Sequence, residues 1–243
     1  MTSKPERSPP AGSAQLTFDL ALRPSLEAGD FLVSDANAAA VTFLDRWPDW
    51  PSPSALLAGP AASGKSHLGK VWQQRSGAIA FSASSIGESA VKTFLRPDMR
   101  ALLIEDIDRG IGDERVVFHL LNQARETHRH LLMTSRIPPG ELEIALPDLR
   151  SRVRALAVLQ LAEPDDALLR GILVKHFADR QIAVDPPVIA YLVRHMDRSF
   201  EAARRTVAAI DQLALARRQK VTRAIAADVL AASKDNGEHG SAG

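Results

Sequence analysis

The stretch GPAASGKS, residues 59–66, has the pattern G-x-x-x-x-G-K-[ST] and lies between a short apolar run and a segment with helical spacing. In this context Gly59 and Gly64 let the backbone approach phosphate groups, whose charge meets the loop amides and a helix N-terminus. Lys65 can reach the terminal phosphates, and the Ser66 hydroxyl can hold Mg²⁺. A glycine-rich turn before a helix is the alternative, but average glycine usage makes a chance match on the order of one in a hundred. We therefore predict that this phosphate loop (residues 59–66) binds a nucleotide.

Short apolar runs alternate with helix-like segments on both sides of the phosphate loop, which favours a parallel sheet covered by helices on both faces. The predicted strands are 54–58, 78–81, 101–104, 130–133 and 155–161. The predicted helices among them are 65–75 and 115–128. After Pro164 the spacing is helical only, and the predicted helices are 166–180, 187–196, 199–217 and 222–232. We expect an α/β nucleotide-binding domain over residues 29–163 and a smaller all-helical domain over residues 164–232.

Composition excludes several classes of protein. The chain has 243 residues, a formal net charge of +1 and no cysteine, so it can form no disulfide and no thiolate site. No apolar run reaches the roughly 18 residues of a transmembrane helix, and the polar start lacks the apolar segment of a secretory signal. The polar, proline- or glycine-rich ends, residues 1–28 and 233–243, are predicted to be disordered tails. We expect a cytoplasmic protein with no membrane contact.

A second chemical signal is the run ALLIED, residues 101–106, in which four apolar residues precede Glu105 and Asp106. In a parallel sheet these acids would lie at the strand's carboxyl end, beside the phosphate loop. One acid could hold Mg²⁺ through water and the other could orient an attacking water. We assign the metal to Glu105 and the water to Asp106, while an acidic turn after a core strand remains the alternative.

Four segments together resemble the AAA+ ATPases of the DnaA initiator group, over roughly residues 29–232. They are GKSHL at 64–68, IED at 104–106, LMTSRIPP at 132–139 and LRSRV at 149–153. The run FLVS at 31–34 with Asn37 also resembles the adenine-side segment of that group. The resemblance implies an AAA+ P-loop sheet flanked by helices with a helical lid, and ADP or ATP with Mg²⁺ as cofactors. It also implies that His67 belongs to the nucleotide-contacting stretch.

The resemblance further implies two sites around the γ-phosphate. Thr134 or Ser135 occupies the place of the first nucleotide sensor, and Arg136 stands where initiators often carry Asp. Arg152 matches the arginine finger, a cation that completes the active site of a neighbouring subunit. A solvated arginine between two others is the alternative interpretation of Arg152.

The second sensor, normally an arginine on the third lid helix, departs from the family pattern. The register that we infer places Glu201 there, with Arg198 and Arg204 one turn to either side. Either Arg204 serves as the sensor, or the site lacks this cation. In the second case we expect weak turnover or a preference for the diphosphate.

The hexapeptide QLTFDL, residues 15–20, looks like the peptide with which bacterial proteins dock onto the DNA-polymerase sliding clamp. Gln15 would take the polar subsite, and Leu16, Phe18 and Leu20 would supply apolar anchors. A first edge strand is the alternative. The combination with an initiator-like core resembles DnaA-related proteins that carry out regulatory inactivation of the initiator.

This resemblance implies two partners, the DNA-loaded sliding clamp and the ATP-bound DnaA initiator, and a nucleoid location reached through the clamp. It implies an activator of a partner's ATPase, with weak ATP hydrolysis of its own. We expect no direct sequence-specific DNA reading, because no helix-turn-helix domain follows the lid. The alternative is a helicase-loader-type AAA+ ATPase that acts on single-stranded DNA or on the replicative helicase.

Overall fold

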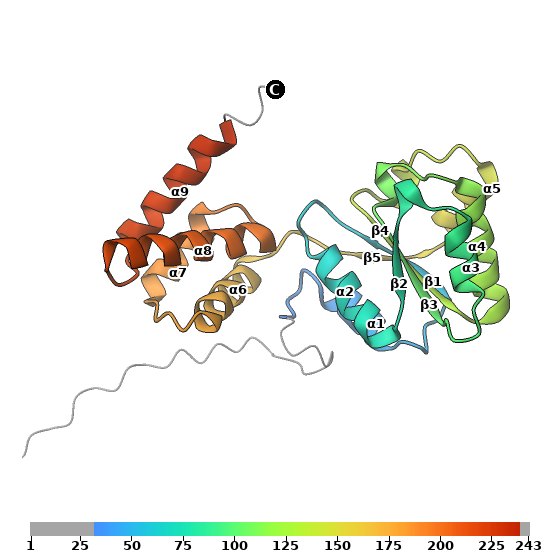
Figure 1. Ribbon diagram of the computed structural model, residues 1–243, viewed down its shortest axis with the longest axis horizontal. Helices are drawn as coiled ribbons and strands as arrows, with labels where there is room; N and C mark the ends of the chain where they lie inside the picture. The colour runs from blue at the N-terminus through green and yellow to red at the C-terminus, as the bar shows by residue number, and fades with distance from the viewer. Residues whose placement is uncertain (1–31, 239–243) are drawn as a thin grey trace, which may run out of the picture.

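The computed structural model describes residues 32–238, with side chains to Ser233. The predicted clamp-binding residues Gln15, Leu16, Phe18 and Leu20 lie outside the described residues, as does Phe31. The described part forms two units side by side, a sheet-containing core domain and a helical lid (Figure 1). No helix within residues 32–238 is both long and apolar enough to cross a lipid bilayer.

The core domain is built on five parallel strands in the order β2-β3-β4-β1-β5. The strands are β1 (Ser54–Ala58), β2 (Ile79–Ser82), β3 (Ala101–Glu105), β4 (His130–Ser135) and β5 (Ala157–Gln160). Every residue of β1 is buried, since β4 and β5 flank it and helices cover both its faces. The phosphate loop leaves the carboxyl end of this central strand, the edge at which open parallel sheets bind ligands. The predicted α/β fold, a parallel sheet flanked by helices, is confirmed.

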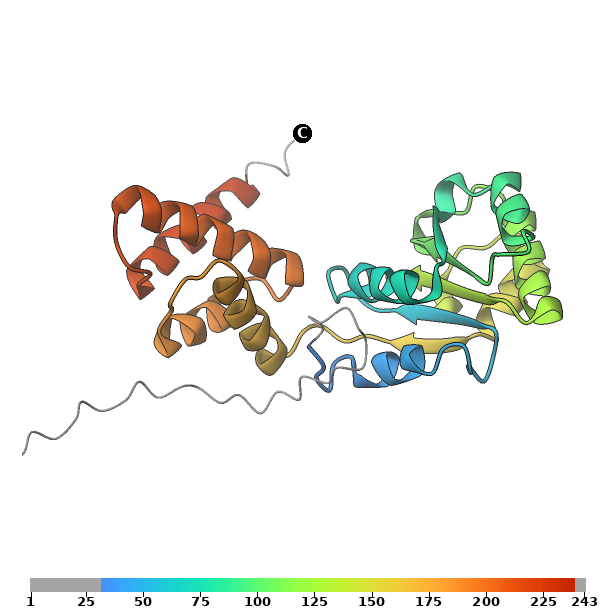
Figure 2. The same cartoon turned by 60° about the horizontal axis from the view of Figure 1, so that its bottom comes forward.

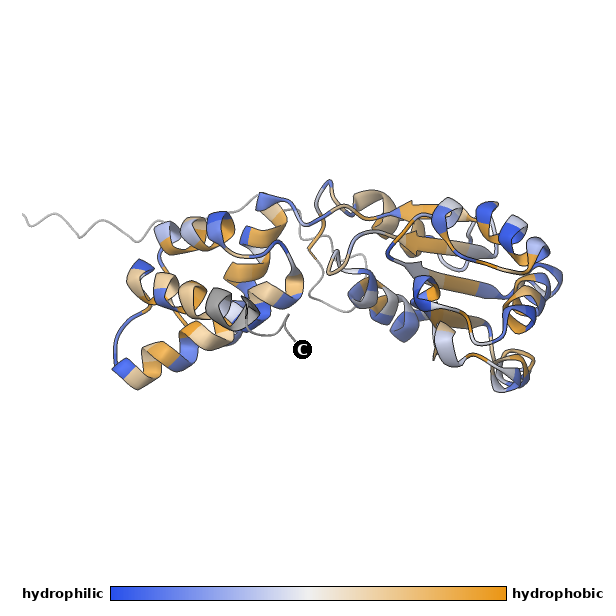
Figure 3. Ribbon diagram, turned by 90° about the horizontal axis from the view of Figure 1, so that it is seen from above, coloured by the Kyte–Doolittle hydropathy of each residue, from blue (hydrophilic) through white to orange (hydrophobic). Residues whose placement is uncertain are grey.

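Helices cover the sheet in two layers because strand side chains alternate between its faces. In β3, Ala101 and Leu103 pack with α1 (Ala38–Asp45) and α2 (Lys65–Ser76). Leu102 and Ile104 point the other way. They pack with α3 (Glu88–Phe94), α4 (Glu114–Thr127) and α5 (Pro147–Arg154). Figure 3 shows the strands as an apolar layer between these helices. Three short 3₁₀ turns, η1 (Ala83–Ser85), η2 (Ile107–Arg109) and η3 (Pro139–Glu141), complete the domain.

The lid has a hydrophobic core of its own. Its helices are α6 (Asp166–Asp179), α7 (Pro186–His195), α8 (Phe200–Arg217) and α9 (Arg223–Glu238). Leu169, Phe177 and Ile210 are among its buried members, and the cluster also includes Leu32, from before α1. Figure 2 shows the lid joined to the core domain by the segment between β5 and α6.

The structure differs from the sequence expectations in its short helices and at its C-terminal end. The helices α1, α3 and α5 were not predicted; they have seven or eight residues, which is too few for a clear 3.6-residue period. The helix α9 continues to Glu238, so the prediction of a disordered tail from Ser233 is wrong for residues 233–238. Once the packed first turns of α9 are formed, each further residue adds a backbone hydrogen bond at little entropic cost.

Candidate functional site

The phosphate loop is closely packed against its surroundings, which explains its glycines. A Cβ atom on Gly59 would lie 2.5 Å from the carbonyl oxygen of Leu161, a backbone atom that cannot move aside as a flexible side chain could. Gly64 has φ +97°, a conformation that disfavours L side chains, and its Cβ would lie 3.0 Å from the Phe200 ring of the lid. The loop therefore connects β1 to α2 and also contacts the lid.

The side chain of Lys65 folds back into the loop. Its Nζ donates hydrogen bonds to the carbonyl oxygens of Gly59 at 2.7 Å and Pro60 at 2.6 Å. Burial lowers the pKa of Lys65, while the charges of Asp108 and Asp106 oppose that shift. The ammonium group thus has two carbonyl partners and two nearby carboxylates, and phosphate oxygens entering the loop would replace the carbonyls as acceptors.

The two acids of the ALLIED run lie at the carboxyl end of β3, where a hydrogen bond joins this end to the end of β4. Asp106 follows β3 with φ +58°, and its backbone N–H donates to the Thr134 hydroxyl at 2.9 Å. The hydroxyl of Ser135 instead donates to the carbonyl of Ile137 at 2.6 Å and so belongs to a turn. Of the two sensor candidates, Thr134 is therefore the one that contacts the acidic loop.

The residues predicted for Mg²⁺ share one side of the sheet. Glu105 ends β3 on the same face as Leu103, whose side chain lies 3.3 Å from a Cβ built on Gly69 of α2. Ser66 lies on that helix, in its first turn. Among the described residues there is no cluster of three or more metal-ligating side chains. Mg²⁺ usually takes one or two carboxylates together with phosphates and waters, so one carboxylate and one hydroxyl fit a nucleotide-borne Mg²⁺.

Sequence reasoning missed Asp108. Its side chain is only 8% exposed, and it accepts a hydrogen bond from the Arg136 backbone N–H at 2.9 Å. The Arg136 guanidinium lies 3.8 Å from the same carboxylate. The sequence has Arg136 where initiators often carry Asp. In the structure, Asp108 of the η2 turn brings a carboxylate to this end of β4. The signal available in the sequence was a third acid, two residues after the predicted pair.

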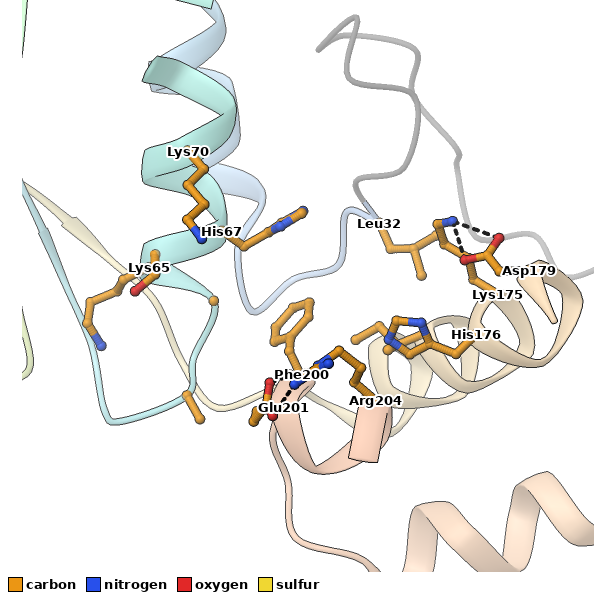
Figure 4. A pocket seen from close by; sticks show the side chains of 14 residues that line it. Leu32, Lys65, His67, Lys70, Lys175, His176, Asp179, Phe200, Glu201 and Arg204 are labelled. Atoms are coloured by element: carbon orange, nitrogen blue, oxygen red, sulfur yellow. Dashed lines mark hydrogen bonds and ion pairs between the residues drawn. The ribbon is translucent and has the colours of Figure 1, made fainter. Parts of the chain in front are cut away.

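A pocket of about 660 Å³ separates the phosphate loop from the lid (Figure 4). This volume is in the range of small-molecule sites. The core domain contributes Leu32, Ala62, Gly64, Lys65, Ser66, His67 and Lys70, and the lid contributes Ile172, Lys175, His176, Asp179, Phe200, Glu201 and Arg204. The rings of His67 and Phe200 stack across the pocket with centroids 6.4 Å apart. Burial, more than the nearby Arg180, lowers the pKa of His176, so this imidazole is neutral at neutral pH.

The lid presents one arginine to the pocket, and that arginine is paired. Arg204 donates to both carboxylate oxygens of Glu201, at 3.1 and 2.7 Å. The pairing lowers the pKa of Glu201 and raises that of Arg204. Arg198 points elsewhere and donates to the Pro164 carbonyl and to Asp166. Glu201 and Arg204 thus share the predicted second-sensor place as a neutral pair.

Arg152 does not line this pocket. Its helix α5 lies at the end of the core domain that faces away from the lid (Figure 1). The Arg152 side chain is half-buried and has no hydrogen bond or ion pair with the rest of the described residues. The start of α5 is fixed by Glu114, whose carboxylate accepts from the backbone N–H groups of Ala145, at 2.9 Å, and Leu146. The Arg152 guanidinium is thus unpaired among the described residues, on a helix whose start is held by two hydrogen bonds.

The chain is related in sequence to replication initiators, although no protein-family model matches it. It is 27% identical over 216 residues to the chromosomal replication initiator protein DnaA of Sphingopyxis alaskensis, which covers 79% of this chain and 47% of that protein. It is 26% identical over 152 residues to DnaA of Cutibacterium acnes, covering 60% of this chain and 30% of that protein. The chain thus spans less than half the length of these curated relatives.

Solved structures share the fold. Domain III of the Thermotoga maritima replication initiation protein DnaA matches with a TM-score of 0.69 at 18% identity, covering 82% of this chain and 93% of that domain. DnaA bound to AMPPCP and single-stranded DNA matches with a TM-score of 0.63 at 18% identity, covering 79% and 66%. The Thermotoga maritima RuvB Holliday junction branch migration motor matches with a TM-score of 0.62 at 16% identity, covering 74% and 61%. The chain is thus similar in sequence to DnaA and shares the AAA+ fold of DnaA domain III and RuvB.

Proposed function

We propose that this protein is a negative regulator of replication initiation. It docks on the DNA-loaded sliding clamp through residues 15–20 and promotes hydrolysis of the ATP held by the DnaA initiator. In this it resembles Hda, the DnaA-related protein of regulatory inactivation. The partners follow from the relation to DnaA and from the clamp-like peptide of the sequence.

The observation that carries the proposal is the setting of Arg152. An arginine that served the chain's own nucleotide would be expected near its own pocket, but Arg152 lies on the far end of the core domain. The side chain is unpaired among residues 32–233, so no carboxylate of that range competes for it. A guanidinium inserted beside a neighbour's γ-phosphate stabilises charge that develops in phosphoryl transfer, and such fingers raise rates by ~10³–10⁵ in GTPases.

The chain's own nucleotide, ADP or ATP, occupies the pocket between phosphate loop and lid. The N–H groups of the phosphate loop, which Pro60 lacks, would hold its phosphates together with Lys65, and His67 lines the pocket wall. Mg²⁺, when bound with the nucleotide, offsets phosphate charge, and Ser66 and Glu105 are the residues that would hold it. Asp106 would orient the attacking water, and the hydrogen bond from its backbone N–H to the Thr134 hydroxyl supports this role.

Turnover at this site is weak in our proposal because the lid provides no uncompensated cation. The Arg204 guanidinium is shared with Glu201, so less positive charge is available to a γ-phosphate. The bound nucleotide then shapes the surface that meets the initiator more than it drives work.

The decisive experiment measures hydrolysis of ATP by DnaA in the presence of clamp loaded on DNA. Arg152→Ala should abolish the stimulation while nucleotide and clamp binding are retained. Arg150→Ala is the matched control, since this arginine is exposed on the same helix and should leave stimulation unchanged. Full stimulation by Arg152→Ala would refute the proposal.

Clamp docking is tested separately by replacing Gln15, Leu16 and Phe18 with Ala. The triple variant should lose clamp pull-down and clamp-dependent stimulation but keep its melting temperature. Retained pull-down would show that these residues serve another purpose.

A helicase-loader-type ATPase is the second candidate, and the contact between Asp106 and Thr134 favours it. A water-orienting acid held by a sensor hydroxyl is the arrangement that a self-sufficient ATPase needs. Intrinsic turnover distinguishes the two. Robust turnover stimulated by single-stranded DNA would indicate a loader, whereas negligible turnover with retained ADP would indicate the adaptor.

A further inference from the structure

A second cavity lies at the opposite edge of the sheet from the phosphate loop. It has a volume of about 250 Å³ and sits where β3 and β4 begin. Three segments line it, and the residues are Trp47, Pro48, Pro97, Met99, Arg100, Thr127, His128, Arg129 and His130. Two of the segments are joined by a backbone hydrogen bond from the His130 N–H to the Arg100 carbonyl, at 2.8 Å. This cavity shares no residue with the nucleotide pocket.

Two lining residues carry buried hydrogen-bond donors without a partner. They are the indole Nε1 of Trp47 and the guanidinium Nη1 of Arg129. The Arg129 guanidinium lies over the Phe94 ring, 5.7 Å from its centroid, and this cation–π contact holds the Arg129 side chain in place. A buried donor without an acceptor is destabilising by an amount comparable to a lost hydrogen bond, so native proteins rarely keep two of them on one cavity.

The cavity wall is positively charged. Its lining residues include Arg100 and Arg129, and none of them is an acid. Two acids lie next to the lining residues in the sequence. The Asp98 carboxylate accepts hydrogen bonds from Arg96 at 2.7 and 3.1 Å, and Asp49 is exposed and does not line the cavity.

Two histidines add polar groups to the wall. Burial lowers the pKa of His130, although the Pro48 carbonyl and Asp49 oppose that shift. At neutral pH this ring is therefore uncharged, and its single N–H is directed to the Pro48 carbonyl. His128 is exposed at the end of α4. The fixed charge of the wall comes from the two arginines.

We propose that this cavity binds a phosphate group. The unpartnered donors of Trp47 and Arg129 call for a ligand with acceptor atoms, and the positive charge of the arginines favours an oxyanion. Two arginine charges match a phosphate dianion better than a singly charged carboxylate, and a guanidinium can bind phosphate oxygens through two parallel hydrogen bonds. The volume leaves space for a small organic group beside the phosphate, against Trp47, Pro48 and Met99.

The test uses the fluorescence of the tryptophans around the cavity as its signal. Trp47 lines it, and the Trp50 ring lies 5.3 Å from that of His130. The full chain carrying Lys65→Ala, which weakens phosphate binding at the phosphate loop, is titrated with sodium phosphate. Sodium acetate and sodium chloride at equal ionic strength serve as references. We expect a saturable change with phosphate alone.

Variants in the Lys65→Ala background locate the binding. Arg100→Gln and Arg129→Gln should each weaken phosphate binding about tenfold or more, since each removes charge-assisted hydrogen bonds. Arg125→Gln, on the exposed face of α4, should bind phosphate like its parent. If Arg129→Gln does not fold, Arg100→Gln decides, because its side chain is exposed.

Three results would overturn the proposal. One is no saturable response to phosphate, and another is equal affinity in Arg100→Gln and the parent. The third is a response to a short single-stranded oligonucleotide but not to inorganic phosphate, which would indicate a nucleic-acid surface instead. Displacement of phosphate by a phosphomonoester would support the proposal and show that an organic group is accommodated.

Discussion

Arg204 and Glu201 form a two-bond ion pair inside the pocket between the phosphate loop and the lid, with donor–acceptor distances of 3.1 and 2.7 Å. Both residues come from the first turns of α8, three positions apart. An arginine at this place is free to meet a γ-phosphate only if its internal partner releases it. We therefore expect the pair to influence which nucleotide the site prefers.

Removing the acid should shift that preference towards the triphosphate. In Glu201→Gln the Arg204 guanidinium has no carboxylate partner, so we expect the ratio of ATP to ADP affinity to rise by about tenfold, the effect of one charge-assisted hydrogen bond. Calorimetry with both nucleotides measures it. Arg204→Ala is the control and should leave the ratio unchanged or lower it. An unaltered ratio in Glu201→Gln would show that the pair does not set the preference.

The same pair predicts how the preference depends on pH. Arg204 holds the pKa of Glu201 below its ordinary value of 4.5, so the carboxylate keeps its charge above that pH and loses it only as the pH falls through the lowered pKa. We expect Glu201 to contribute no change in the ATP-to-ADP ratio between about pH 5.5 and 8 and to raise it only in stronger acid. Measuring the ratio in Glu201→Gln over the same range separates this group from others.

Lys65 should be required for nucleotide binding more than for folding. In Lys65→Ala the phosphates lose charge-assisted hydrogen bonds, so we expect a loss of about 10- to 100-fold in affinity. The melting temperature should change little, because the lysine is bonded only to the loop's own carbonyls and to Ser63. Lys92→Gln, an exposed lysine of α3, controls for loss of charge.

Gly64 offers a test of the contact between phosphate loop and lid. Gly64→Ala forces an alanine to φ +97° and brings its Cβ to 3.0 Å from the Phe200 ring. Gly77→Ala forces the same kind of backbone at φ +67° with no atom within 4 Å. Both should lower the free energy of unfolding by about 1–2 kcal/mol, but only Gly64→Ala should weaken nucleotide binding. Equal nucleotide affinity in the two variants would contradict the proposed role of this contact.

Glu114 is expected to act on the initiator through Arg152. Its carboxylate holds the N–H groups of Ala145 and Leu146 before α5, so Glu114→Gln should loosen the helix that carries the guanidinium. We predict a decrease of about tenfold in stimulated hydrolysis, the effect of one weakened charge-assisted hydrogen bond. Nucleotide affinity should stay unchanged, and a parallel loss of both would indicate general unfolding. Asp113→Asn, which alters the cap of α4 but not these bonds, is the matched control.

The sequence contained the architecture of the sheet more completely than that of the site. Short apolar runs identified all five strands, because buried parallel strands read as continuous hydrophobic segments. Helices such as α5 were invisible because eight residues beginning with proline carry little periodic signal.

The side-chain arrangements in the site depend on tertiary contacts, which no local pattern encodes. The carboxylate of Asp108 meets the end of β4 from 28 positions away, and the ring of Phe200 covers the phosphate loop from another domain. Spacing alone placed Glu201 and Arg204 near each other, but it could not say that they pair with each other inside the pocket.

Leu32 is the first described residue, and its side chain belongs to the lid core although its sequence position precedes the core domain. The backbone then runs on through Asn37, whose amide donates to the Leu32 carbonyl at 3.1 Å, and Ala36 accepts from Ala162 beside the lid connection. The chain thus passes beside the segment that joins the core domain to the lid before it enters the core domain. A force applied to the chain before Leu32 would therefore act on the hydrophobic core of the lid before it acted on any strand. Tethering the protein through its N-terminal segment would then change how the lid sits over the pocket.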